Sequence, residues 1–192
     1  MRLLTRLLLA IGLATAVVGC SPTAETDVPP SREPRPVPSV STPYRLPSVA
    51  PRVVKQWDAL RYKDKPCDLF TDEQARAIGF VEPGWVDTPR DGFKQCWRMN
   101  GRNSFFVKFY DTDLVGKVYR RETIWPGGEG ATPLTVGGQP ALRVVFPGGD
   151  QCAIAVAIAD NQGFEIYFDE EGADASVHAT MAAETVMHNL GA

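Results

Sequence analysis

The side chains best suited to chemistry are sparse in this chain of 192 residues. Its two histidines, His178 and His188, lie ten residues apart on one predicted helix, which is not the His-x-x-x-His spacing of a zinc site. The serines beyond residue 52 are Ser104 and Ser176, and neither lies in a Gly-x-Ser-x-Gly nucleophile elbow. The sequence therefore predicts no catalytic residue, no metal ligand and no cofactor, and we expect a protein that is not an enzyme.

Glycine pairs and acidic clusters are explained by turns and solvated surfaces. Gly127-Gly128, Gly137-Gly138 and Gly148-Gly149 lack the Gly-Lys-Ser/Thr ending of a phosphate loop. Asp111-Thr112-Asp113 and Asp169-Glu170-Glu171 lack the spacing and the glycine of a calcium loop. Carboxylate pairs that cleave glycosides meet only in space, so a wall-polymer hydrolase stays open as an alternative.

One cysteine stands where an export pathway modifies proteins. Arg2 and Arg6 precede a short apolar stretch, which ends in Val17-Val18-Gly19-Cys20. This order is typical of a secretory signal, and the stretch is shorter than the roughly 20 residues of a membrane span. The last four residues resemble a bacterial lipobox, which implies that residues 1–19 are removed and that Cys20 carries a diacylglyceryl lipid such as one with palmitate. The alternative is an ordinary signal peptide with a chance cysteine.

The mature chain divides into a tether and one domain. Nine of the sixteen prolines lie between residues 21 and 52, which have almost no large apolar side chains, so we expect residues 20–52 to form a disordered tether. Residues 53–192 are long enough for a single globular domain. Fourteen Lys/Arg against twenty Asp/Glu residues give this domain a formal charge of −6, which argues against a nucleic-acid partner.

The first half of the domain is predicted to contain short helices and one hairpin. Thr71 and Gln74 have capping-box spacing at the start of a helix that ends at Gly79. Asn100-Gly101 lies between two aromatic-rich runs and predicts a β-hairpin. The other expected elements are helices over 53–62 and 111–121 and a loop over 125–132.

The hairpin has two registers that the sequence leaves open. A two-residue turn places Cys96 on the face of Phe105, Val107 and Phe109, whereas a bulged three-residue loop places Trp97 there.

The second half predicts a three-stranded antiparallel meander followed by a helix. The strands are expected over 139–146, 151–159 and 164–168. The middle strand has large apolar residues and Cys152 on one face and four alanines on the other, which is typical of a central strand covered on both sides. A helix over 175–190, capped by Asp174, is expected to pack closely on the alanine face. Together these elements predict an α+β domain in which an antiparallel sheet packs with a C-terminal helix and short N-terminal helices.

Four segments in order carry a resemblance to a known family: Cys67-Asp68-Leu69-Phe70-Thr71, Cys96-Trp97, Val136-Gly137-Gly138-Gln139-Pro140-Ala141 and Cys152-Ala153-Ile154-Ala155-Val156. They resemble actinobacterial envelope lipoproteins known as domain of unknown function 3558. The resemblance implies a surface lipoprotein with a small disulfide-bearing α+β domain, and it implies no catalytic residue. Family members often have a further cysteine at the start of the last helix, where this chain has Ser176.

Three cysteines remain beyond Cys20, and an odd number leaves one unpaired. We expect a disulfide between Cys67 and Cys96, with Cys152 a buried free thiol that behaves as a small hydrophobe. Pairing of Cys152 with one of the other two is the alternative.

Charge is unevenly distributed along the domain. Residues 90–121 contain eight basic and three acidic residues, whereas from Glu129 onward Arg143 faces nine acids. Such an asymmetry predicts a positive surface that binds an anionic wall polymer or lipid, unless these charges only pair with the acidic half of the domain. The expected members are Lys94, Arg98, Arg102, Lys117, Arg120 and Arg121.

These observations predict an exported lipoprotein on the outer face of the cytoplasmic membrane, where it acts as a binding or scaffold module of the cell envelope. Its expected partners are the membrane, through the lipid on Cys20, and an envelope protein or an anionic wall or lipid surface, with no nucleic acid. Besides the hydrolase, an accessory subunit of an envelope transporter or sensor is an alternative.

Overall fold

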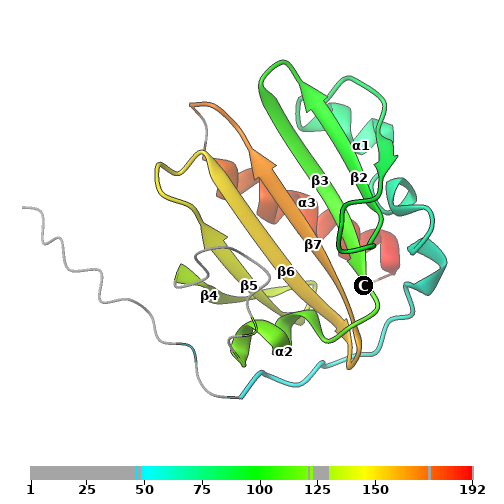
Figure 1. Cartoon of the computed structure of the whole chain (residues 1–192), viewed down its shortest axis with the longest axis vertical. Helices are drawn as coiled ribbons and strands as arrows, with labels where there is room; N and C mark the ends of the chain where they lie inside the picture. The colour runs from blue at the N-terminus through cyan, green and yellow to red at the C-terminus, as the bar shows by residue number, and fades with distance from the viewer. Residues whose placement is uncertain (1–45, 47–48, 121, 123–129, 173, 192) are drawn as a thin grey trace, which may run out of the picture. The chain divides into compact units, whose positions relative to one another are not determined.

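A seven-stranded antiparallel sheet is the frame of the domain (Figure 1). The computed structural model describes residues 46, 49–120, 122, 130–172 and 174–191. The strands lie in the order β1-β2-β3-β7-β6-β5-β4. Their bounds are β1 Trp85–Asp87, β2 Gln95–Asn100, β3 Asn103–Tyr110, β4 Thr132–Val136, β5 Gln139–Val145, β6 Gln151–Ala159 and β7 Gln162–Asp169. The α+β class with an antiparallel sheet is therefore confirmed.

Each of the three α-helices in the described part of the chain begins at a residue whose side chain caps its N-terminus. The helices, with the two 3-10 turns, are η1 (Leu60–Tyr62), η2 (Pro66–Leu69), α1 (Asp72–Ala77), α2 (Leu114–Tyr119) and α3 (Ala175–Leu190). The predicted capping box is present at α1, where Thr71 and Gln74 each bond the other's backbone N–H. Asp174 caps α3, and Gly191 ends it in the left-handed conformation.

The predicted helix over 53–62 is wrong, because only its last three residues form a helical turn. The backbone N–H groups of this segment bond to the sheet and to two buried glutamines. Trp57 N donates to the Ile158 carbonyl at 2.8 Å, and Ala59 N donates to Gln162 Oε1 at 3.0 Å. Val54 N donates likewise to Gln139 Oε1 at 3.1 Å. Partners more than 80 residues away outweigh the local helical spacing.

The hairpin has a two-residue turn, one of the two predicted alternatives, but the turn lies one residue later than Asn100-Gly101. Its central residues are Gly101 and Arg102, with Gly101 at φ +64°, so Asn100 pairs with Asn103. Cys96 lies opposite Val107 and therefore on its face. Glycine at the first central position suits a turn that matches the twist of the two strands.

Both ends of the sheet have a strand that the sequence did not predict. β1 has three residues, all exposed, and pairs with β2. β4 contains Pro133, pairs with β5, and begins within the predicted loop over 125–132, whose residues 125–129 lie outside the described part of the chain. Short strands and prolines are typical of sheet edges, and they weaken the sequence signal for a strand.

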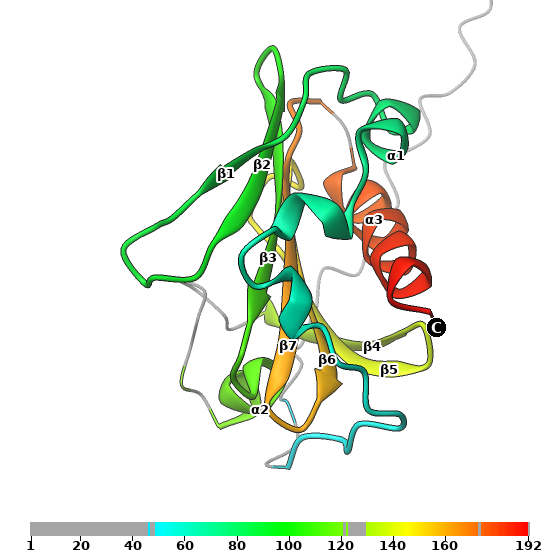
Figure 2. The ribbon, with the colours of Figure 1, turned by 90° about the vertical axis from the view of Figure 1, so that its right-hand side faces the viewer.

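The main core lies between the sheet and α3, and here the expected packing is wrong. α3 packs on the large-residue face of β6, against Cys152, Ile154, Val156 and Ile158, and not on the alanine face. The helix itself supplies the small side chains, since Ala175, Ala179, Ala182 and Ala183 are fully buried. Figure 2 shows α1 and α3 on the same side of the sheet.

The alanine face of β6 packs against α2. Ala153, Ala155 and Ala157 belong to a second apolar cluster with Leu114, Val115 and Val118 of α2. Leu46 and Ala50, which precede the expected start of the domain at residue 53, also pack against this cluster. We call the two faces of the sheet the α3 face and the α2 face, after the helix that packs on each.

The close approach of α2 depends on a glycine in β7. A Cβ atom added at Gly163 would lie 2.8 Å from the Val156 carbonyl oxygen and 2.9 Å from Leu114 Cβ. We expect Gly163→Ala to lower the free energy of unfolding by about 1–3 kcal/mol, as overpacking does. Gly130→Ala is the matched control, because no atom lies within 4 Å of its added Cβ. Urea unfolding of both variants checks this, and equal stabilities would show that α2 does not press on the sheet.

Candidate functional site

Four aromatic side chains cross the α2 face in one row, one from each of β1, β2, β3 and β7. The strand registers place Trp85 opposite Trp97, Trp97 opposite Phe106, and Phe106 opposite Tyr167. Ring centroids are 5.1 Å apart for Trp97 and Phe106 and 5.2 Å apart for Phe106 and Tyr167. We call these four residues the aromatic ladder.

The aromatic ladder is only partly covered by the described chain. Trp85 is 44% exposed, and Trp97, Phe106 and Tyr167 are half-buried. On the opposite face of the same strands, Phe105 and Phe168 are fully buried under α1 and α3. Contiguous exposed apolar surface on a folded domain marks an interaction site more often than scattered apolar residues do.

Two further side chains extend this surface. Met99, two residues after Trp97 on the same face, is 39% exposed. Phe146, beyond the end of β5, has its ring centroid 6.1 Å from that of Tyr167. Tryptophan, tyrosine, phenylalanine and methionine are the residue types enriched at protein interfaces.

A buried polar network borders the aromatic ladder on the side of α2. Lys108 is 5% exposed and forms an ion pair with Asp91. Tyr110 donates a hydrogen bond to Glu165 Oε2 at 2.6 Å, and burial together with this carboxylate raises the pKa of the Tyr110 hydroxyl. The network keeps its charges paired inside the fold, so it anchors the loop over 88–94 on the sheet.

A shallow hollow of about 250 Å³ lies between this loop and α2. Its lining residues are Asp91, Phe93, Tyr110, Thr112, Leu114 and Lys117. This volume is below the roughly 300–1,000 Å³ of small-molecule pockets. The hollow is therefore smaller than a typical small-molecule pocket.

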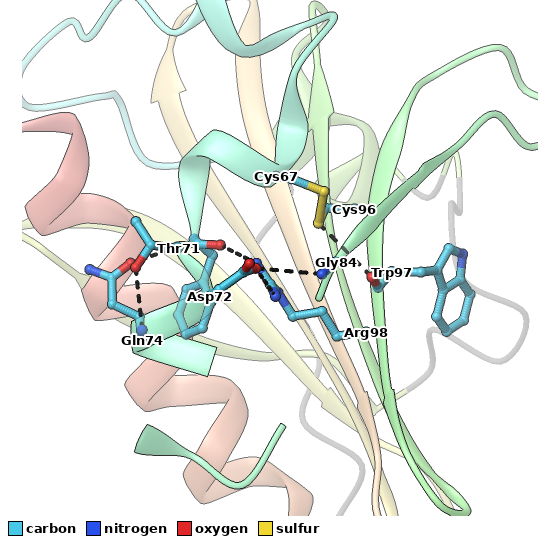
Figure 3. Close-up of a disulfide and its surroundings, with 9 residues drawn as sticks. Cys67, Thr71, Asp72, Gln74, Gly84, Cys96, Trp97 and Arg98 are labelled. Carbon is cyan, nitrogen blue, oxygen red and sulfur yellow. Dashed lines mark hydrogen bonds and ion pairs between the residues drawn. A yellow bond between two sulfur atoms is a disulfide. The ribbon is translucent and has the colours of Figure 1, made fainter. Parts of the chain in front are cut away.

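The predicted disulfide between Cys67 and Cys96 is present and is part of a closed structural cluster (Figure 3). Arg98 follows Cys96 on the same face of β2 and is 1% exposed. Its guanidinium forms an ion pair with Asp72 and donates to the Phe70 carbonyl at 2.7 Å. The disulfide and this arginine fix η2 and α1 to the sheet.

Gly84 closes the cluster from the side of β1. A Cβ atom at this position would lie 2.7 Å from Cys96 Sγ and 2.9 Å from Arg98 Cζ. Its backbone N–H also donates to Asp72 Oδ1 at 3.5 Å. Because the Gly84 backbone packs directly on them, the disulfide and the guanidinium have a structural role here.

Cys152 is a free thiol, buried on the α3 face of β6. Burial raises its pKa to about 12, so the unreactive thiol form predominates at neutral pH.

The predicted basic patch is wrong as a single surface. Arg98 is buried in the disulfide cluster, and Lys94 and Arg102 lie near opposite ends of β3. Lys94 pairs with Asp64 at 2.7 Å, Arg102 with Glu171 at 3.1 Å, and Arg120 with Asp113 at 2.9 Å and Glu122 at 3.0 Å. Lys117 lines the hollow on α2, and Arg121 lies outside the described residues. Counting basic and acidic residues along the sequence shows neither this separation in space nor the ion pairs with nearby acids.

Other predicted residues have simple positions. Cys20 lies outside the described residues. His178 Nδ1 is 2.7 Å from Glu170 Oε2, whereas His188 is exposed near the end of α3. Within the described residues, no cluster of three His, Cys, Asp or Glu side chains is placed to hold a metal ion, and no helix is long and apolar enough to cross a membrane.

Sequence reasoning missed the aromatic ladder. The signal was the presence of aromatic residues on both faces of the hairpin, with Trp97 and Phe106 on one face and Phe105 on the other. The row could not be predicted, because it also requires strand β1 and the pairing of β3 with β7, and the sequence predicted neither.

The fold and this surface define a small disulfide-bearing α+β domain with one exposed aromatic sheet face. A family model described as "Protein of unknown function (DUF3558)" matches residues 15–189. The chain therefore belongs to the DUF3558 family. No curated protein and no solved structure matches it.

The ion pair in the disulfide cluster generates a pH prediction. The hydrogen bond from Arg98 lowers the pKa of Asp72 below its usual value of 3.8. A carboxyl group with a lowered folded-state pKa contributes stability above its unfolded pKa and loses it as the pH falls through the folded pKa. We expect Asp72→Asn to cost about 1–3 kcal/mol at pH 7, less than a fully buried pair, because the Asp72 side chain is 50% exposed.

The difference between wild type and Asp72→Asn should shrink as the pH falls below about 4. Urea unfolding at pH 7, 5 and 3 with the disulfide intact measures it. Glu73→Gln is the control, because Glu73 is an exposed acid in the same helical turn without an ion pair to a described residue. A difference that stays constant from pH 7 to pH 3 would refute the role of this carboxylate.

Proposed function

We propose that this chain is an exported lipoprotein, held on the outer face of the cytoplasmic membrane by a lipid on Cys20, whose domain is a non-enzymatic binding or scaffold module of the cell envelope. The lipobox-like Val17-Val18-Gly19-Cys20 sequence supports the anchor. The Cys67–Cys96 disulfide supports an extracytoplasmic location, since disulfides persist mainly in oxidising compartments.

The aromatic ladder is the observation that carries the binding role. Burying a large aromatic side chain is worth about 1.5–3 kcal/mol, so leaving several of them partly exposed forgoes stability in the free domain. That free energy is recovered when a partner covers the row. A scaffold or recognition domain in the envelope needs such a surface, and it needs no catalytic residues.

The lipid anchor is tested by Cys20→Ala. We expect wild-type chain made in a lipoprotein-processing host to incorporate a clickable palmitate analogue, and Cys20→Ala to incorporate none and to keep residues 1–19. Cys152→Ala is the control, because it removes the other thiol that is not in the disulfide and should leave labelling intact. Palmitate on the Cys20→Ala chain would show that the anchor lies elsewhere.

The binding role is tested by site-specific photo-crosslinking in intact cells. A benzophenone amino acid in place of Trp85 should give a discrete adduct, because Trp85 lies at the open end of the ladder. The same amino acid in place of Met181, which is 51% exposed on α3, should give none or a different adduct. If both positions give no adduct, or the same one, the aromatic ladder is not the binding surface.

A further inference from the structure

We propose that the aromatic ladder binds an extended, basic segment of a partner polypeptide, in which apolar side chains alternate with polar ones and two cationic side chains flank them. This inference rests on the proposed function and names the partner chemistry of the same surface. Three observations carry it: how the rings stand, which charges flank them, and which charges are already paired.

The rings of the aromatic ladder favour side chains that insert between or beside them. Phe106 and Tyr167 stack on each other with an interplanar angle of 15°, so one face of each ring is occupied by the other ring. Trp97 meets Phe106 in an edge contact at 61°, and it remains half-buried. A row of closely spaced, partly exposed rings suits the aliphatic and cationic side chains of a polypeptide.

Carboxylates flank the aromatic ladder at both ends and on opposite sides. Asp87 follows Trp85 by two residues on β1, and Asp169 follows Tyr167 by two residues on β7, so both lie on the α2 face. Each accepts a hydrogen bond only from a neutral amide in the described structure: Asp87 from Gln95 at 3.2 Å and Asp169 from Gln151 at 3.0 Å. Neither forms an ion pair with a described residue.

Most basic side chains around this face are already neutralised. The ion pairs are Lys94 with Asp64, Lys108 with Asp91 and Arg102 with Glu171. Arg90, in the loop after β1, is a cation at that end with no ion pair to a described residue. The two carboxylates without an ion pair to a described residue, Asp87 and Asp169, therefore make this surface complementary to a cationic partner.

The spacing of the two carboxylates sets the length of the partner segment. Three strand spacings separate β1 from β7, and the acids lie one side-chain row to either side of the ladder, which places them about 20 Å apart. An extended chain spans this distance in about six residues. Two basic residues six positions apart therefore reach both carboxylates, while the apolar side chains at the positions between them meet the rings.

An anionic bilayer fits this surface less well, because it would face Asp87 and Asp169. A second copy of this chain would likewise bring like charges together. Both remain outcomes of the test, and both would overturn the proposal.

The probe is the fluorescent peptide Arg-Ser-Leu-Ser-Leu-Ser-Arg, which carries its basic and apolar residues on one face when extended. The comparison peptides replace both arginines by glutamate or both leucines by serine. Binding to the full chain is measured by fluorescence anisotropy at low and high salt. We expect the basic peptide to bind at least about 10-fold more tightly than either comparison peptide, with affinity falling as salt rises.

Matched variants assign the binding to the ladder. Trp85→Ala should weaken it about 10-fold or more, as loss of an interface tryptophan does, and Asp87→Asn with Asp169→Asn should remove most of the salt dependence. Met181→Ala and Glu73→Gln, an apolar and an acidic change away from this face, should change affinity less than about 2-fold. Circular dichroism confirms that each variant is folded.

Three results would overturn the proposal. They are equal binding of the acidic and basic peptides, Trp85-dependent sedimentation of the Cys20→Ala chain with phosphatidylglycerol vesicles, and Trp85-dependent self-association in analytical ultracentrifugation. In the last two, the ladder still binds a partner, so the proposed function stands and only the partner changes. Loss of both peptide binding and the Trp85 crosslink would reject the proposed function as well.

Discussion

The rest of the structure depends on the alternation of side chains along β6. This strand is the third from the β4 edge of the sheet, and helices pack on both of its faces. Its large residues and Cys152 face α3, and its alanines face α2. Each face therefore accepts a different kind of helix. α3 approaches the large residues with alanines of its own, and α2 approaches the alanines with leucine and valine. Complementary sizes on the two sides give both interfaces close packing.

The two helices cover unequal parts of the sheet. α3 has 16 residues and, with α1 and η2, buries the aromatic residues of the α3 face. α2 has six residues and lies over the end of β7 that contains Gly163. The disulfide cluster adds to this asymmetry, because Cys67 and Arg98 hold η2 and α1 on the α3 face. The α2 face of β1, β2 and β3 is therefore left to the aromatic ladder, and the exposed surface follows from how the core is closed.

Helix starts and strand periodicity could be predicted from the sequence, because they depend on residues only a few positions apart. Thr71 with Gln74 marks a helix start, and the β6 alternation marks a central strand. The failures involve distant partners. Gln139 and Gln162 hold residues 54–59 extended, and the pairing of β3 with β7 places Phe106 beside Tyr167. Arg98 was predicted to be a surface charge because the groups that bind its guanidinium, Asp72 and the Phe70 carbonyl, lie 26 and 28 residues earlier.

The central claim is that one sheet face is closed and the other open, and hydroxyl-radical footprinting of the full chain tests it most directly. Oxidation is read by mass spectrometry and corrected for the intrinsic reactivity of each residue type. The account predicts rapid oxidation of Trp85, Trp97, Met99 and Tyr167, with Phe105, Phe164 and Phe168 protected as core residues. If the aromatic ladder were as protected as those three phenylalanines, the α2 face would already be covered in the free protein, and the account would be contradicted.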